Sequence, residues 1–431
     1  MDDNAAVGLK SELDLFSATP FQLAIDDSSF LEVHPVASLN DNSSTIEWYV
    51  GASGENYLDL GHSIIHMQVS IKKKTGVDIG NTDHVAPINY FLNTMFSECS
   101  VFLNDKQVSS QVNYAYRAIF ESLLLSSKSS QNSMLTSALF FKDTAGKHDE
   151  VKDDSTNAGF KSRQVASSLS KTMDLIGPLH FDLGMQPKLL INGVSLRIKM
   201  ERNKDIFSLM SENDSYQCKV HSAKLYIRKI IVSPSIVLAH EKALEKGNIK
   251  MPIRRTDVKS FTLSNGLASI TIANAFIGQI PSRLVMGFVS NDAYNGKINK
   301  NPFNFKHNNL AYLTVLNSGK MFPAKAYQPN FETDNYARSY LSLFTDLSRY
   351  HNHQNINISF SEFKNGYTLY AFDLTPDFAS GESHNSTTKN GNIAIDIKFS
   401  SPLEDTQNLV VYAVYNNCIE IDKSRTVFTD Y

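Results

Sequence analysis

Four short motifs recur in the same order in the two halves of this 431-residue chain. The first-half motifs are Asn104, Asn113-Tyr114-Ala115, Phe181-Asp182-Leu183 and Asn192-Gly193, and their second-half counterparts are Asn317, Asn335-Tyr336-Ala337, Phe372-Asp373-Leu374 and Asn390-Gly391. The first two motifs are 113 − 104 = 9 residues apart in the first half and 335 − 317 = 18 in the second, which indicates a longer loop there. A period this long predicts a duplicated domain, because the units of solenoid repeats run to roughly 20–50 residues.

Alternation of apolar and polar residues predicts that both halves are built mainly from β-strands. Residues 65–72 show the period-two pattern of a half-buried strand, and the same pattern returns at 194–200 and 393–399. The nearly continuous apolar run at 409–415 is typical of a strand that is covered on both faces. The segments around Asn104 and Asn317 are predicted to be hairpin turns. The residues therefore favour a duplicated β-sandwich.

Helical periodicity is confined to three segments. Two of them follow the Asn-Tyr-Ala motifs, where the apolar stripes are Tyr116, Ile119, Phe120, Leu123 and Leu124 in the first half and Tyr336, Ala337, Tyr340, Leu341, Phe344 and Leu347 in the second. We expect each helix to pack on the side of its own sandwich, the second one capped by Thr333 or Asp334. A third helix is predicted from Ile236 to Lys246, with Ser235 as its cap and Gly247 at its end, and connects the halves.

These patterns predict four parts of the chain. They are an amino-terminal arm at 1–20, a first sandwich at 21–235, a connector at 236–250 and a second sandwich at 251–431. Three polar insertions are expected to be exposed, mobile loops. They are 126–171, its expected counterpart at 296–309, and 379–390.

Composition excludes several classes of protein. The chain is 42% hydrophobic, 10% aromatic and 20% charged, which is enough apolar material for a core in each half and argues against disorder. The net charge of −3 gives no general attraction for a polyanion, so no direct nucleic-acid binding is expected. No segment approaches the roughly 18 consecutive apolar residues of a membrane span.

Cysteine usage and the first residues predict the site of synthesis. Cys99, Cys218 and Cys418 are odd in number and widely spaced, which favours free thiols and a reducing cell interior. The stretch Met1-Asp2-Asp3-Asn4 lacks the basic and apolar regions of a signal peptide.

No motif with a known chemical role occurs in the sequence: there is no Gly-rich phosphate loop, Cys-x-x-Cys pair or nucleophile elbow. His351 and His353 lack a third ligand at a recognisable spacing and are interpreted as solvated loop residues. His62 and His66 lie on one face of a predicted strand, as a surface pair. Cys99 has no basic neighbour and is expected to be a buried structural residue. We predict no catalytic, cofactor-binding or metal-binding residue.

Paired carboxylates for glycoside chemistry depend on tertiary structure, so a carbohydrate-binding or glycoside-processing β-sandwich is the alternative interpretation. The single tryptophan, Trp48, disfavours a sugar-stacking platform, although the 18 tyrosines could replace it.

Longer stretches from Glu55 onward carry a family resemblance. They are Phe141 to Gly146, Leu190 to Val194, Val232 to Ser235, Leu238 to Gly247, Pro252 to Arg255, Asn301 to His307, Tyr340 to Phe344, Gly366 to Leu374 and Glu420 to Asp422. These stretches resemble the major capsid proteins of the Polinton (Maverick) and adintovirus lineage. The resemblance is weakest in residues 1–50 and in the polar insertions.

The resemblance implies an all-β fold of two tandem eight-stranded jelly rolls, a double jelly roll, each with a flanking α-helix. It also implies a structural protein without enzyme activity. Such proteins form homotrimers that act as pseudo-hexameric capsomers and tile an icosahedral capsid. The implied partners are neighbouring capsomers and a penton or minor capsid protein, and the implied location is the virion.

Overall fold

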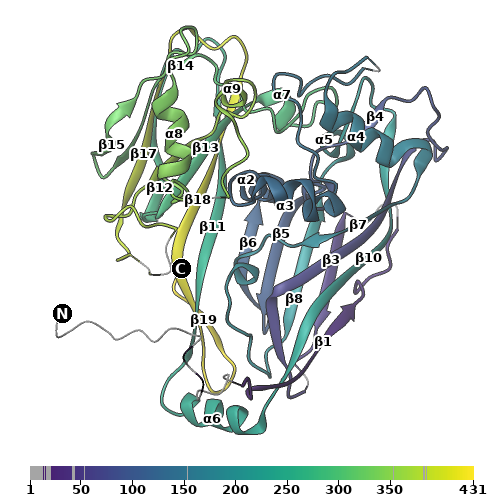
Figure 1. The fold of residues 1–431 in the computed structure, drawn as a ribbon, viewed down its shortest axis with the longest axis vertical. Coiled ribbons are helices and arrows are strands. Elements are labelled where there is room, and N and C mark those ends of the chain that lie inside the picture. Colours follow the sequence, from purple (N-terminus) through teal and green to yellow (C-terminus); the bar gives the residue numbers. More distant parts are fainter. Residues whose placement is uncertain are drawn as a thin grey trace.

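The structure, a computed structural model, describes residues 13, 15, 21–40, 44–52, 54–152, 154–352, 354–381, 384 and 386–431. The chain forms two β-sandwiches that lie next to each other, with helices between them and at both ends (Figure 1). All strand pairs in the four large sheets are antiparallel.

The first sandwich is made of two four-stranded sheets. One sheet has the order β1 (Ile25–Val33), β10 (Tyr216–Val232), β3 (Tyr57–Lys73) and β7 (Met173–Pro178). The other has the order β2 (Thr45–Val50), β8 (Leu196–Arg202), β5 (Phe96–Leu103) and β6 (Lys106–Val112). The short strands β4 (Val85–Pro87) and β9 (Leu209–Ser211) pair separately.

The second sandwich repeats this arrangement. Its sheets have the orders β11 (Ile249–Leu263), β18 (Gln407–Ile421), β13 (Arg283–Ser290), β16 (Tyr370–Asp373) and β12 (Ser269–Gln279), β17 (Asn390–Phe399), β14 (Leu310–Asn317), β15 (Lys320–Tyr327), with β19 (Val427–Thr429) added beside β18. In each half the eight main strands, counted along the chain, are ordered 1-8-3-6 and 2-7-4-5. This strand order defines a jelly roll, so the fold is a double jelly roll.

Helices fill the connections. They are α1 (Phe91–Thr94), α2 (Tyr114–Leu124), α3 (Lys128–Asn132), α4 (Ala158–Ser167), α5 (Asp205–Ser208), α6 (Pro234–Leu244), α7 (Asn291–Tyr294), α8 (Ala337–Thr345) and α9 (Phe360–Lys364), with 3-10 turns η2 (Met134–Ala138), η3 (Ser168–Ser170) and η4 (Asp182–Met185). Helices α2 and α8 each follow the fifth strand of their jelly roll, so the predicted flanking helices are confirmed. Among the residues described, no helix is long and apolar enough to cross a membrane.

The four sequence motifs occupy equivalent places in the two jelly rolls. They lie in the turn between the fourth and fifth strands, at the start of the flanking helix, beside the sixth strand and before or within the seventh. The turns pair Leu103 with Lys106 and Asn317 with Lys320. The true equivalent of Asn104 is therefore Ser318, one residue after the predicted one. Both turns need positive φ at their two central residues, as two-residue hairpins do.

The predicted strands form the core. In β3, Ile65, Met67, Val69 and Ile71 are completely buried, and every residue of β18 from Gln407 to Tyr415 is buried, as the continuous apolar run predicted. The second sheets contribute the alternating residues of β8 and β17 in the same way. Two facing layers of apolar side chains thus build one core in each jelly roll.

Three predictions about helices need correction. The connector helix begins at Pro234, not Ile236, because proline is favoured in the first helical turn, and its cap position is Ser233. In α8 the buried residues are Ser339, Ser342 and Leu343 rather than the whole predicted stripe. Neither Thr333 nor Asp334 caps α8, whose cap position is Tyr336.

The polar insertion at 126–171 lies between α2 and β7. Its topological counterpart is 346–369, between α8 and β16, and not 296–309, which precedes β14. Phe140 and Phe160 within the insertion are buried. The expectation of an exposed loop was therefore wrong for this segment, which forms helices and has its own core contacts.

Candidate functional site: the seam between the jelly rolls

Helix α2 lies in the seam between the two jelly rolls (Figure 1). All eleven of its residues are buried, including the charged Arg117 and Glu121. The predicted apolar stripe includes Tyr116 and Phe120, whose rings contact the second jelly roll. Helix α2 packs on the side of its own sandwich, as expected, and the second jelly roll in addition covers its other side.

A buried ionic network runs along α2. The Arg117 guanidinium donates to Glu121 Oε1 (2.9 Å) and to Asp182 Oδ1 (2.8 Å), and all three side chains are at most 3% exposed. His180 Nδ1 lies 2.6 Å from Glu121 Oε2, and His180 Nε2 lies 2.9 Å from the Tyr90 hydroxyl. Each charge in this network therefore has a partner, which a buried charge requires.

The network holds Glu121 ionised. Burial alone would raise the pKa of the Glu121 carboxyl, but the Arg117 guanidinium and His180 outweigh burial and hold the pKa at about 2. The carboxylates in turn raise the pKa of Arg117 above its ordinary value, although burial opposes this. The seam thus contains permanent charges at pH 7.

The network continues into the second jelly roll. The Tyr412 hydroxyl donates to Glu121 Oε1 (3.1 Å), and the Thr256 backbone N–H donates to Asp182 Oδ1 (3.2 Å). The Gln111 amide donates to the Thr256 carbonyl. Because these bonds join β6, α2 and η4 to β11 and β18, they fix the orientation of one jelly roll relative to the other.

Aromatic contacts complete the seam. Tyr116 stacks on Tyr294 with ring centroids 5.6 Å apart, and Phe120 stacks on Phe305 at 5.3 Å. Such pairs add roughly 0.5–1.5 kcal/mol each beyond their buried area. The seam therefore has the character of a domain core rather than of a wet, transient contact.

A second buried cluster joins the insertion 126–171 to the loops of the second jelly roll. Arg163 donates to Asp143 Oδ1 (2.7 Å), and Asn301 donates to Asp143 Oδ2 (2.9 Å). The Tyr367 hydroxyl donates to the Asp143 carbonyl (2.6 Å). These hydrogen bonds therefore form a second connection between the two jelly rolls, in addition to the network along α2.

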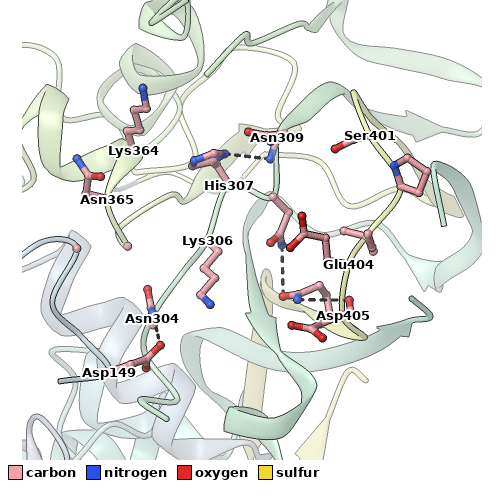
Figure 2. Close-up of a pocket in the computed structure, with 16 residues that line it drawn as sticks. Asp149, Asn304, Lys306, His307, Asn309, Lys364, Asn365, Ser401, Glu404 and Asp405 are labelled. Carbon is pink, nitrogen blue, oxygen red and sulfur yellow. Dashed lines mark hydrogen bonds between the residues drawn. The ribbon is translucent and has the colours of Figure 1, made fainter. Parts of the chain in front are cut away.

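A polar cavity of about 480 Å³ opens beside this cluster (Figure 2). Its walls are loops of both jelly rolls, and it is lined by Gly146, Asp149, Asn304, Lys306, His307, Asn308, Asn309, Lys364, Asn365, Gly366, Ser401, Pro402, Leu403, Glu404, Asp405 and Gln407. This lining contains no Phe, Tyr or Trp, so the stacking platform that a sugar site favours is missing from it.

His307 in this cavity has a structural role. Its Nδ1 accepts from the Asn309 backbone N–H (3.0 Å; Figure 2). The His307 ring also stacks on Phe331, with ring centroids 4.2 Å apart. Burial lowers the pKa of His307 to about 4, with Lys364 as a smaller cause, so the ring is neutral at pH 7. Asn304 donates to Asp149 Oδ2 (3.0 Å) at the opposite wall. The arrangement supplies hydrogen bonds but no activated nucleophile.

The histidines singled out in the sequence are placed apart. His62 pairs with Asp59 (2.7 Å), and His66 pairs with Asp174 (2.6 Å). His351 is exposed against the Tyr350 ring, and His353 lies outside the described residues. In the part of the chain that the structure describes, no group of three or more His, Cys, Asp or Glu side chains could hold a metal ion.

The cysteines are free, as predicted. Cys99 and Cys218 are buried and Cys418 is half-buried. Burial raises the pKa of the Cys99 thiol to about 12, so this residue is an unreactive core residue, as expected.

Sequence reasoning missed the ionic network. The only available signals were Asp182, which belongs to a repeated motif, and the four-residue spacing of Arg117 and Glu121 within an otherwise apolar helix. Neither signal identifies Tyr412 or Thr256, which come from the other half of the chain.

Two edge strands remain open on the outside. In β1 only Val33 of the nine residues is buried, and β12 is exposed along most of its length. Asp26 and Asp27 stand at the start of β1, and an irregularity between Ile272 and Phe276 interrupts the pairing of β12. Charges and irregularities of this kind disfavour the addition of further strands, so contacts through side-chain faces are favoured.

The fold defines a double jelly-roll protein, and solved structures with the same fold support this assignment. No known family model matches the sequence. Among curated proteins, an uncharacterized protein of Caenorhabditis elegans is 25% identical over 405 residues, which are 89% of this chain and 93% of the relative.

Solved structures of capsid proteins have this fold. A chain of the Sputnik virophage gives a TM-score of 0.65 at 14% identity, with 99% of this chain and 93% of that chain covered. The Faustovirus major capsid protein gives 0.59 at 10% identity, with 96% and 92% covered, and the mavirus major capsid protein gives 0.55 at 12% identity, with 99% and 95% covered. At these identities the likeness shows the fold.

Proposed function

We propose that this protein is a viral major capsid protein, whose function is self-assembly rather than catalysis. One observation carries the proposal. The two jelly rolls, which are joined through a buried seam, resemble solved capsid proteins over nearly the whole length of the chain. Two similar modules in one chain allow a homotrimer to present six similar edges, as a pseudo-hexameric capsomer that tiles an icosahedral shell.

The seam within the chain suggests how copies meet. Here α2 and β6 lie against β11 and β18. The equivalent elements of the second jelly roll, α8 and β15, would lie against β1 and β10 of a neighbouring copy, because β1 and β10 hold the positions of β11 and β18. Three contacts within chains and three between chains would close a ring of six jelly rolls.

The surfaces that would meet are complementary. Leu341 on α8 is 45% exposed and Phe30 on β1 is 54% exposed, so both offer apolar area. Lys320 and Lys325 on β15 are exposed cations, whereas β1 carries the exposed Asp26 and Asp27. Contacts between the lysines of β15 and the aspartates of β1 would favour this pairing of copies, since Lys224 and Arg228 of the adjacent β10 already pair with Glu32 and Asp59.

Light scattering during size-exclusion chromatography tests the proposal. A trimer has a mass of 3 × 48.1 = about 144 kDa. Leu341→Asp and Phe30→Asp should each give a folded monomer, whereas the control Val165→Asp, on the exposed side of α4, should remain a trimer. A wild-type monomer at micromolar concentration would contradict the proposal, and trimers of both variants would contradict the assigned contact.

Several finer parts of the proposal follow from the sequence. The resemblance supports the Polinton (Maverick) and adintovirus lineage, with the division at 21–235, 236–250 and 251–431. We place the protein in the virion after synthesis in a reducing cell interior, with neighbouring capsomers and a penton or minor capsid protein as partners and no direct contact with nucleic acid. The predicted arm at 1–20 lies outside the described residues except for Leu13 and Leu15. Electron micrographs of the expressed protein should show hexagonal capsomers.

A further inference from the structure

Helix α6 lies at the end of the molecule opposite α7 and α9 (Figure 1). Most of its residues are not buried. Of its eleven residues only Leu244 is buried, while Ile236 and Val237 are half-buried and Leu238 is exposed. A helix of this length gains most of its stability from packing of its apolar face. An apolar surface is therefore available beside α6.

A cavity of about 860 Å³ lies beside α6. Its walls are mostly apolar, and it is lined by Ala24, Ile25, Tyr57, Lys188, Leu189, Ile191, Val232, Ile236, His240, Ala243, Leu244, Lys246, Gly247, Asn248, Ile249 and Lys250. This size is typical of a ligand or peptide site.

Three lysines stand among the lining residues. Lys188 donates to the Lys250 carbonyl (2.8 Å), and the Lys250 ammonium lies 3.9 Å from the nearest Glu420 carboxylate oxygen. Lys188, Lys246 and Lys250 are all exposed. An occupant that combines apolar side chains with carboxylates would therefore match both the walls and the charged groups of this cavity.

The chain itself contains such a segment. The sequence Glu12-Leu13-Asp14-Leu15-Phe16 alternates carboxylates with large apolar residues and precedes β1. In the structure Leu13 and Leu15 are exposed, Leu15 by 77%, and Phe21 is 81% exposed. Exposed large apolar residues so close together mark an interaction segment.

We propose that the cavity beside α6 binds residues 12–16 of a second copy of this chain, an inference that rests on the proposed association of copies. Ala24 lines the cavity, and the eight steps along the chain from Phe16 to Ala24 span at most about 27 Å, so the length of chain allows residues 12–16 to reach a cavity of this kind. Exchange between copies is favoured over insertion into the same chain, because Leu13 and Leu15 remain exposed in the single chain. Exchanged arms of this kind link subunits without a new fold.

Disulfide trapping in the full-length chain tests the exchange. Cys418 is first replaced by Ser, because it is the only cysteine that is not fully buried. Two differently tagged proteins are then co-expressed, one with Leu15→Cys and one with Ala243→Cys, and oxidised. We expect a linked species that carries both tags. Leu238→Cys, on another face of α6 and not in the cavity lining, is the matched control and should give at least tenfold less product.

The same pair of cysteine variants, Leu15→Cys and Ala243→Cys, tests the role of the lysines and the identity of the segment that fills the cavity. Lys188→Glu with Lys246→Glu should lower the yield about tenfold, since each carboxylate contact contributes a factor of roughly two to five. Lys242→Glu, outside the cavity lining, should leave the yield unchanged. Linkage only within one chain, in a protein that carries both cysteines, would overturn the proposal, as would a fatty acid found in the cavity by native mass spectrometry without any arm linkage.

The outcome separates this inference from the proposed function. A trimer by light scattering without the Leu15–Ala243 disulfide would overturn the arm exchange and leave the capsid proposal standing. A dimer by light scattering that gives the mixed disulfide would support the exchange and contradict the trimer.

Discussion

Helices α2 and α8 hold the same place in the two jelly rolls but differ in what surrounds them. Both follow an Asn-Tyr-Ala motif after the fifth strand. In α2 every residue is buried, whereas in α8 only Ser339, Ser342 and Leu343 are, and Leu341 is 45% exposed. The first helix is covered by the second jelly roll of its own chain, and the second helix has an open side in the single chain.

The difference teaches which sequence features belong to the fold and which belong to the seam. Asp182 and Asp373 come from equivalent motifs and are both buried. Asp373 accepts bonds from the loop that follows it, from Thr375 and Ser380, whereas Asp182 accepts bonds from α2 and from the other jelly roll. The same motif therefore serves a local turn in one half and the joining of domains in the other.

The largest difference in stability between the two helices is expected when an aspartate replaces one apolar residue in each of them. Ile119→Asp in α2 should lower the free energy of unfolding by more than about 4 kcal/mol, because it buries an unpaired charge at a site that is 1% exposed. Leu341→Asp in α8 should change the unfolding free energy of the single, unassociated chain by less than about 1 kcal/mol. Urea denaturation measures both, and equal losses would show that the two helices are covered alike.

Arginines provide the next comparison. Arg117→Ala leaves Glu121 and Asp182 buried without their cation, and should cost about 3–5 kcal/mol in the free energy of unfolding. Arg338 in α8 is exposed and donates to the Ala326 carbonyl, so Arg338→Ala should cost about 1 kcal/mol or less. A small loss for Arg117→Ala would mean that the network does not stabilise the seam.

Acid should weaken the seam. The pKa of Glu121 is about 2 in the folded protein and 4.5 ordinarily, so its contribution is complete above pH 4.5 and is lost as the pH falls toward 2. The expected loss over this range is about 3 kcal/mol. Unfolding measured by fluorescence between pH 6 and pH 2.5 should show it, and Glu121→Gln should have a flatter profile; parallel profiles would contradict the prediction.

The smallest effect concerns the end of α8. Asp346 follows the helix, and burial raises its pKa from 3.8 to about 6. Its ionisation therefore opposes folding at pH 7, and stability should rise as the pH falls through 6 toward 3.8. Asp346→Asn should stabilise the protein by about 1 kcal/mol at pH 7 and by less at pH 5, as measured by thermal unfolding. Destabilisation at pH 7 would contradict this sign.

Much of the fold could be predicted from the sequence because strands carry their own signal. The period-two pattern located β3, β8 and β17, the continuous apolar run located β18, and the motifs located the two turns, although the pairing of Asn104 was wrong by one residue. The helical pattern was less informative. It predicts one apolar face, but in α8 Leu341 and Ala337 were assigned to that face and are exposed. An apolar stripe does not show how much of the helix surface the neighbouring elements cover.

The sequence by itself determined a duplicated β architecture. The alternation of apolar and polar residues and the repeated motifs can be read within short segments, and they do not depend on which distant residues those segments contact. Tertiary structure alone decided which helix is enclosed, which acids meet Arg117 and where the large cavity opens. Those features depend on Tyr412 and Thr256, which lie 291 and 74 residues along the chain from the acids they contact, and on Ile249, which lines the cavity together with the distant Ala24. Long-range proximity arises only when both jelly rolls have folded and their seam has closed.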